Sequence, residues 1–231
     1  MLREQKKEGR RRTILHAAET LVRETNSTDF SMRELALRAG FSLATTYNLI
    51  GSKATVLYAL LNQCMDRVDV ARLSTLERGD PIEHVFQASD AAVTIYTADP
   101  HFYRPLLRFL LGVPDPVNRP LFMDRAFRYW WAVVQSLSEC GGFRDSFAPQ
   151  ALARDLQIFF AGTIDFWVHD ELDSAQFKAQ IRMGVAMRLL ALGLDQYSTR
   201  LKSEIATYGR LIDPLLPDID PARRPGGLTN L

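Results

Sequence analysis

The sequence contains little cysteine, and its cysteines form no ligand pattern. Only Cys64 and Cys140 occur among 231 residues, with no CxxC motif and no histidine close to either. Zinc sites and disulfide frameworks need several such residues at fixed spacings, so we expect neither, and no metal. We interpret both cysteines as buried thiols, because free cysteine is among the most buried residue types.

Long apolar runs are also missing. No stretch approaches the ~20 apolar residues that a membrane-spanning helix requires, and the N-terminal sequence MLREQKKEGRRR lacks the apolar segment of a secretory signal. We therefore expect a soluble, cytoplasmic protein with no membrane partner.

Catalytic motifs are the third absence. The four histidines, at positions 16, 84, 101 and 169, are far apart, and there is no HExxH, no GxSxG and no phosphate-binding glycine loop. We expect that the protein is not an enzyme and needs no cofactor.

Charge is present but unevenly distributed. Residues 1–53 hold ten Lys or Arg against six Asp or Glu, a net charge of +4, whereas the remaining residues carry a net charge of −3. Six of the cations fall within the first twelve residues, namely Arg3, Lys6, Lys7, Arg10, Arg11 and Arg12. We predict that residues 1–9 form a flexible basic arm that follows phosphates; the alternative is a solvated terminus.

The apolar spacing is helical almost everywhere, and alternation typical of strands is essentially absent. The expected fold is therefore all-α. We expect helices at about 10–24, 32–39, 43–50, 54–76, 81–98, 100–112, 117–139, 149–170, 174–194 and 197–212. Residues 214–231 are too rich in Pro and Gly to be regular.

Residues 31–50 predict a helix-turn-helix unit. Ser31 and Glu34 can form a capping box, Gly40 permits a sharp left-handed turn, and Ser42 caps a second helix that has few large apolar residues. That helix carries the hydroxyl residues Ser42, Thr45, Thr46 and Tyr47, and Lys53 follows it. Such groups are common donors to DNA phosphates. We therefore predict that one face of this helix enters a DNA groove; the alternative is that Thr45 and Tyr47 only cover a surface.

The stretch RRTILHAAETLV, followed by FSMRELALRAGFSLATTYNLIGSKATVLYALL, resembles the DNA-binding head of the TetR family of bacterial transcriptional repressors over residues 10–61. The resemblance implies a helix-turn-helix domain at 10–53 and a helical ligand-binding and dimerisation domain at 54–213. It implies phosphate contacts for Thr45, Tyr47 and Lys53, and base contacts for Arg33, Leu43 and Ala44.

The sequence departs from the family pattern at several of these positions. Leu49 stands where an aromatic or histidine phosphate contact is usual, although Ile50 can still fill the core. Leu43 and Ala44 offer apolar contact with thymine methyl groups rather than hydrogen bonds.

Aromatic residues are concentrated between positions 102 and 131. The consecutive Tyr129, Trp130 and Trp131 point around more than half a helix, so all three cannot face one seam. An ordinary core explains many of the aromatics, but an apolar cavity with a few polar groups is the usual form of a small-molecule site. The residues predicted for it are His84, Asp90, Tyr96, His101, Tyr129 and Trp130. We expect an aromatic or amphipathic apolar inducer.

Two later helices are each apolar over more than one face, which predicts a four-helix interface with a second copy. The residues predicted there are Phe159, Gly162, Phe166, Ile181, Val185 and Arg188. Burial within the monomer is the alternative. Taken together, the sequence predicts a homodimeric, ligand-responsive repressor that binds a palindromic operator in double-stranded DNA. The alternative is a helical ligand-binding or interaction protein with weak or no specific DNA binding.

Overall fold

The computed structural model describes residues 2–74, 80–139 and 148–212. All regular structure within these ranges is helical, so the all-α prediction is confirmed. The helices are α1 (Leu2–Thr25), α2 (Met32–Ala39), α3 (Leu43–Ile50), α4 (Lys53–Ser74), α5 (Pro81–Ala98), α6 (Pro100–Gly112), α7 (Asn118–Glu139), α8 (Pro149–Val168), α9 (Ser174–Ala191) and α10 (Ser198–Ile212), with a 3-10 turn, Asp195–Tyr197, before α10. Residues 140–147, which include Cys140, and the expected irregular segment 214–231 lie outside the described ranges.

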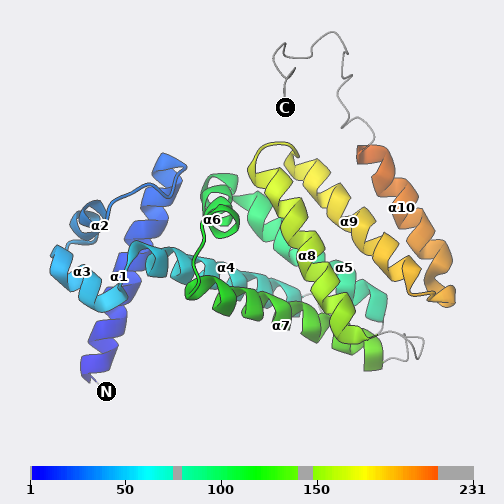
Figure 1. Cartoon of the computed structure of the whole chain (residues 1–231), viewed down its shortest axis with the longest axis horizontal. Helices are drawn as coiled ribbons and strands as arrows, with labels where there is room; N and C mark the ends of the chain where they lie inside the picture. Colours follow the sequence, from blue (N-terminus) through cyan, green and yellow to red (C-terminus); the bar gives the residue numbers. More distant parts are fainter. Residues whose placement is uncertain (1, 75–79, 140–147, 213–231) are drawn as a thin grey trace, which may run out of the picture.

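The first three helices form a head at one end of an elongated molecule, and α9 and α10 lie at the other end (Figure 1). Ser31 caps α2 by accepting a hydrogen bond from the Glu34 amide at 3.1 Å. Gly40 has φ of 73°, the left-handed conformation that lets α2 end and the chain turn. The Phe41 amide then donates to the Ala36 carbonyl at 2.9 Å. The local signals in the sequence therefore set this turn.

The first helix is longer than the sequence pattern indicated. Helix α1 begins at Leu2, so residues 2–9 are helical, and the prediction of a flexible arm is wrong for them. The apolar face expected at 10–24 is present, since Ile14, Ala18 and Leu21 are buried. A helix can extend beyond its packed segment when its residues have good helix propensity, as Arg, Glu, Gln and Lys do.

Helix α4 joins the head to the body (Figure 1). It contacts α1 on one side and α5, α6 and α7 on the other. Its buried residues, from Val56 to Val68, belong to one continuous apolar cluster that includes Ile14 and Leu35 in the head and Phe86 and Trp167 in the body. One apolar core therefore runs through both head and body, and α4 is the helix that carries it across.

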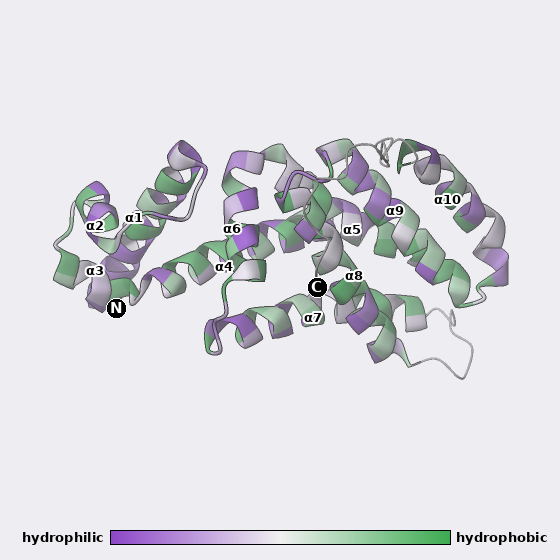
Figure 2. Ribbon diagram, turned by 45° about the horizontal axis from the view of Figure 1, so that its top comes forward, coloured by the Kyte–Doolittle hydropathy of each residue, from purple (hydrophilic) through white to green (hydrophobic). Residues whose placement is uncertain are grey.

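The remaining helices build the body around that core. Figure 2 shows hydrophobic and hydrophilic residues interleaved along α7, α8 and α9. Asp80 caps α5 by accepting from the Ile82 amide at 3.0 Å, and Pro81 occupies the first turn, as its start signal predicted. Cys64 is buried in α4, and burial raises the pKa of its thiol to about 12. No helix in the described ranges has the length and apolar character that crossing a membrane demands.

Candidate functional site

Helix α3 divides its residues between the core of the head and an outward face. Thr46 and Ile50 are buried, and the Thr46 hydroxyl donates to the Ser42 carbonyl at 3.1 Å. Ile50 therefore fills the core position expected for it. Leu43, Ala44 and Tyr47 are exposed. This short helix thus presents an outward face that does not pack against the rest of the head.

The hydroxyls at the start of α3 are organised by a cap. The Ser42 Oγ accepts from the Thr45 amide at 3.1 Å and lies 2.8 Å from the Thr45 Oγ1. Ser42 is exposed and Thr45 half-buried. Thr46, which the sequence grouped with them as a phosphate donor, points into the core instead.

The two cations predicted near this face sit on neighbouring elements. Arg33 is exposed on α2. Lys53, the first residue of α4, is half-buried with its Nζ 5.2 Å from the centre of the Phe30 ring. Arg33 can therefore reach a partner by side-chain rotation, whereas the Lys53 ammonium is held close to the head.

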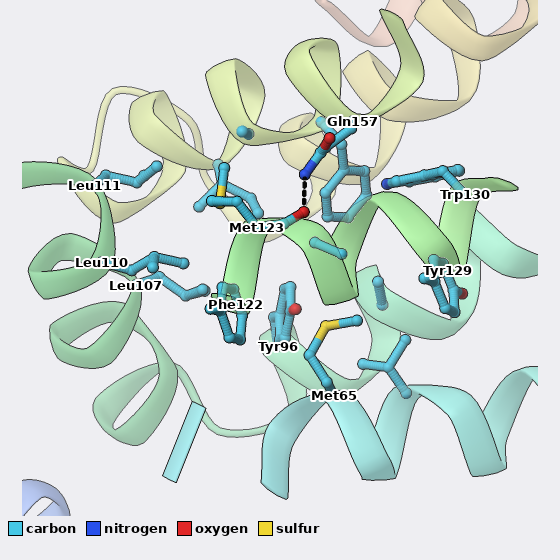
Figure 3. Close-up of a pocket in the computed structure, with 16 residues that line it drawn as sticks. Met65, Tyr96, Leu107, Leu110, Leu111, Phe122, Met123, Tyr129, Trp130 and Gln157 are labelled. Atoms are coloured by element: carbon cyan, nitrogen blue, oxygen red, sulfur yellow. Dashed lines mark hydrogen bonds between the residues drawn. The ribbon is translucent and has the colours of Figure 1, made fainter. Parts of the chain in front are cut away.

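A cavity lies inside the body, between α4, α5, α6, α7 and α8 (Figure 3). Its volume is about 60 Å³. Its lining comprises Met65, Val68, Ala92, Tyr96, Leu107, Leu110, Leu111, Phe122, Met123, Ala126, Tyr129, Trp130, Gln157, Phe160, Ala161 and Ile164. Among these lining residues there is no Asp, Glu, Lys, Arg or His. The site is therefore apolar and uncharged.

The few polar groups of the lining are mostly engaged by the protein itself. The Tyr129 hydroxyl donates to the Ala88 carbonyl at 2.7 Å. The Gln157 amide nitrogen donates to the Met123 carbonyl, also at 2.7 Å (Figure 3), and its oxygen accepts from Arg154. Burial raises the pKa of Tyr96 and of Tyr129 well above the ordinary tyrosine value, so both hydroxyls stay neutral.

Of the six residues predicted for this site, Tyr96, Tyr129 and Trp130 line the cavity and the other three do not. His101 is exposed on α6, and His84 lies elsewhere on α5. The assignment of Asp90 is wrong for a specific reason: its carboxylate forms an ion pair with Arg182, whose Nε lies 3.0 Å from Oδ1. The Asp90 carboxylate therefore links α5 to α9 and does not line the cavity.

Sequence reasoning missed Gln157. Helix α8 carries an inward stripe that includes Ala153, Leu156, Phe160 and Ile164, and Gln157 is a polar residue on it. A polar residue within an apolar stripe was the signal available, but the broad apolar surface of α8 pointed to a dimer interface instead.

The residues predicted for a dimer interface divide into two groups. Ile181 and Val185 are fully buried inside the chain, so their assignment to an outward surface is wrong. Their burial follows from the packing of α9 against α5, α8 and α10. Gly162 and Phe166 are exposed on α8.

Phe159 and Arg188 form a stack beside that outward face. The Arg188 guanidinium lies 3.8 Å above the Phe159 ring centre and donates from Nε to Asp155 at 2.6 Å. The ring covers Gly184 of α9, where a Cβ would meet its Cε2 at 2.7 Å. Two apolar residues that were not predicted, Ile158 and Met187, are exposed nearby in sequence, at 63% and 52%.

A charged network ties the head to the body next to the cavity. Glu19 of α1 accepts from Arg23 and from Arg67 of α4, each at 2.8 Å. Arg67 also donates to the Tyr103 hydroxyl of α6 at 3.2 Å. The Tyr103 ring lies 5.3 Å from that of Tyr96, which lines the cavity. The contacts therefore run from the cavity to α1.

Similarity to solved structures agrees with this architecture. A TetR-family regulator from Syntrophomonas wolfei aligns with a TM-score of 0.64 and 16% identity over 78% of this chain and 93% of that one. SmeT, the repressor of the Stenotrophomonas maltophilia multidrug efflux pump SmeDEF, aligns with a TM-score of 0.61 and 21% identity, over 78% and 89%. NalD, the secondary repressor of the MexAB-OprM pump of Pseudomonas aeruginosa, aligns at 0.56 and 21%, over 77% and 95%. No protein-family model and no curated protein matches the chain. The chain shares the fold of TetR-family transcriptional regulators.

Proposed function

We propose that the protein is a homodimeric transcriptional repressor whose α3 enters the DNA major groove and whose cavity takes a small neutral ligand that releases the DNA. The observation that carries the proposal is the division of α3 described above. Leu43, Ala44 and Tyr47 leave one face of it uncovered at the end of the molecule, while Thr46 and Ile50 anchor the other. A helix held rigidly with one face free is what groove binding requires.

Base recognition by this face is mainly apolar. Leu43 and Ala44 can contact thymine methyl groups, and Arg33 on α2 supplies a donor for a base or a phosphate. Ser42, Thr45, Tyr47 and Lys53 are the proposed phosphate contacts.

The dimer surface proposed for the described chain is the outward face of α8 together with the exposed edge of α9. It comprises Ile158, Phe159, Gly162, Phe166, Met187 and Arg188. Exposed apolar residues in such a cluster are typical of an interface. A second copy related by two-fold symmetry would cover them with the same residues.

The dimer is tested by placing a charge on that face. Ile158→Asp would bury an unpaired carboxylate between copies, which is strongly unfavourable, and should give a folded monomer in sedimentation velocity. Leu121→Asp is the matched control, because Leu121 is 68% exposed on α7. A dimer that survives Ile158→Asp would exclude this face.

The cavity selects against charge. Moving an ionised group into it would leave that group without a counter-ion, which costs far more than apolar contact returns. The ligand is therefore neutral and apolar or aromatic. A cavity of about 60 Å³ has room for only a few waters. A larger ligand must therefore push lining side chains apart, and the flexible Met65 and Met123 can yield first.

Displacement of α4 links the cavity to DNA binding. Met65 and Val68 of α4 line the cavity, and the same helix begins at Lys53, directly after α3. Half-sites are read together only when the two recognition helices are about 34–36 Å apart or a multiple of that. A ligand that moves α4 would change that separation.

The decisive experiment is a gel shift with the DNA upstream of the gene that encodes the chain. We expect a protein–DNA complex that disappears when unlabelled upstream DNA is added as competitor and persists when DNA of random sequence is added. Binding no stronger than that of random DNA would favour the alternative, a ligand-binding protein without an operator.

A further inference from the structure

One side of α1 is apolar where it packs against the other helices of the head. Toward the N-terminus the same side carries a stripe of cations. A helix repeats its face every three or four residues. One such series along α1 is Arg3, Lys7, Arg10, Ile14, Ala17 and Leu21. The last three are buried, whereas Arg3, Lys7 and Arg10 are exposed. The three cations therefore face the same side of α1 as the core of the head.

This basic segment overhangs α3. We define the overhang as residues 2–12 of α1, and Figure 1 shows it extending past α3. A surface hollow lies between the two elements, lined by Arg3, Glu4, Lys6, Lys7 and Arg10 of α1 and by Leu49 of α3. The hollow thus opens beside the C-terminal turn of the helix whose outward face is proposed to enter the groove.

The charge in the hollow is strongly positive. Four cations face one carboxylate, that of Glu4, which pairs loosely with Lys7 at 3.7 Å. Arg12 lies on another side of α1, in a separate hollow beside Asp66 and Arg67 of α4. Four of the six cations of the overhang therefore line the hollow beside α3, and Arg12 lies on the other side of the helix.

We propose that the overhang binds the sugar-phosphate backbone of duplex DNA beside the groove that α3 enters, as a rigid helix and not as a disordered arm. The inference rests on the DNA binding proposed above. Leu49 gives the α3 side of the hollow no charge or hydrogen-bond donor from its side chain, so the phosphate contacts at this edge come from α1.

The dimensions suit a short run of phosphates. From Arg3 to Arg10 the helix rises about 10 Å at 1.5 Å per residue. One DNA strand presents a phosphate about every 3.4 Å along its axis, so about three phosphates lie opposite the overhang. Removing the cation that faces one phosphate should reduce the salt dependence, the slope of log K against log salt, by about 0.9.

The first test neutralises the stripe. In the variant Arg3→Gln/Lys7→Gln/Arg10→Gln the helix propensity is preserved, because Gln is a good helix former. Affinity for a short duplex of arbitrary sequence is measured by fluorescence anisotropy between about 50 and 200 mM salt, the range over which phosphate contacts dominate. We expect the slope to fall in magnitude by up to about 3 per bound protomer. Arg12→Gln, on the other side of α1, should change it by much less.

The second test separates a rigid helix from an arm of the same charge. A Cβ added at Gly9 would have no atom within 4 Å of it, so Gly9→Ala introduces no clash and favours the helix. Gly9→Pro keeps every cation but breaks or kinks the helix. We expect Gly9→Ala to retain the slope and Gly9→Pro to reduce it.

The outcomes distinguish the two proposals. If the unaltered protein binds no duplex at low salt, the proposed function and this inference both fail. If it binds, and the triple variant keeps the slope of the unaltered protein, the overhang makes no contact with the backbone and only this inference fails. If the triple variant loses the slope but Gly9→Pro does not, the cations act as a flexible arm and the rigid overhang is excluded.

Discussion

Thr46 and Tyr47 are adjacent on α3, but they differ in burial. Thr46 is fully buried, whereas Tyr47 is 47% exposed. Tyr47→Ala should weaken binding to upstream DNA about tenfold or more, as expected when a hydrogen bond of roughly 1.5–3 kcal/mol to a charged phosphate is removed, and leave the melting temperature nearly unchanged. Thr46→Ala should do the reverse, because it removes a buried hydroxyl that bonds Ser42. Calorimetry and anisotropy on both variants check this. A melting temperature that falls sharply for Tyr47→Ala would show that Tyr47 is structural.

The Phe159 ring lies on Gly184 and leaves no space there for a side chain. Alanine at this position would overlap Phe159, whose ring is also covered by Arg188. Gly184→Ala should destabilise the protein by about 1–3 kcal/mol through overpacking, even though alanine favours a helix. Gly112→Ala on α6, outside the proposed dimer surface, is the control, because no atom lies within 4 Å of its added carbon. Urea unfolding would contradict the prediction if both variants were equally stable.

At the scale of elements, Glu19 joins α1 to α4 through its hydrogen bond with Arg67. Burial opposes its charged form, but hydrogen bonds from Arg67 and Arg23 outweigh burial and lower its pKa below the ordinary 4.5. A carboxyl with a lowered folded-state pKa stabilises the fold above its ordinary pKa and loses this contribution as the pH falls through its folded pKa. The stability difference between the unaltered protein and Glu19→Gln should therefore be constant from neutral pH to about 5 and shrink below about 4.5.

Thermal unfolding at several pH values checks this, and Glu24→Gln on the same helix provides the comparison. Glu24 pairs with Arg38 at an exposed site, where an ion pair is worth at most about 1 kcal/mol. A stability difference for Glu19→Gln that does not change at acid pH would mean that its carboxylate does not hold α1 to α4.

The Tyr103 hydroxyl of α6 completes the series of contacts that runs from the cavity through Arg67 to α1. Tyr103→Phe removes the bond to Arg67 but keeps the ring beside Tyr96. We expect the variant to bind ligand normally while the ligand weakens DNA binding less than in the unaltered protein. Tyr58→Phe is a matched control, because the Tyr58 hydroxyl is buried with no hydrogen-bond partner in the described ranges, so its removal should be neutral or stabilising. Equal ligand effects in all three proteins would exclude Tyr103 from the connection.

At the scale of the whole molecule, the proposed function requires ligand and DNA to weaken each other's binding. A neutral aromatic compound selected by thermal shift should weaken DNA binding by about 5- to 150-fold, a coupling of about 1–3 kcal/mol. DNA must weaken ligand binding by the same factor. Trp130 lines the cavity and Trp131 does not. Quenching of the tryptophan fluorescence by the bound ligand should therefore disappear in Trp130→Phe and persist in Trp131→Phe. Equal ligand affinity with and without DNA would show that the cavity does not regulate the head.

The sequence by itself determined the helices and the turn of the head. Caps at Ser31, Ser42 and Asp80, the left-handed Gly40 and the apolar period act over a few residues, so they can be recognised without the fold. The same local logic identified an outward face on α3 and the aromatic helices around the cavity. It misjudged the start of α1, because the sequence there contains neither a cap nor an apolar face to mark the boundary.

Only the tertiary structure decided which apolar faces are covered within the chain and which polar residues reach the cavity. Ile181 and Val185 are buried because α5, α8 and α10 surround α9, and Asp90 pairs with Arg182, 92 residues away. Such contacts depend on the relative placement of distant helices, which periodicity does not encode. The same is true of the basic stripe: its spacing is present in the sequence, but the hollow it forms with Leu49 exists only because α1 continues as a helix beside α3.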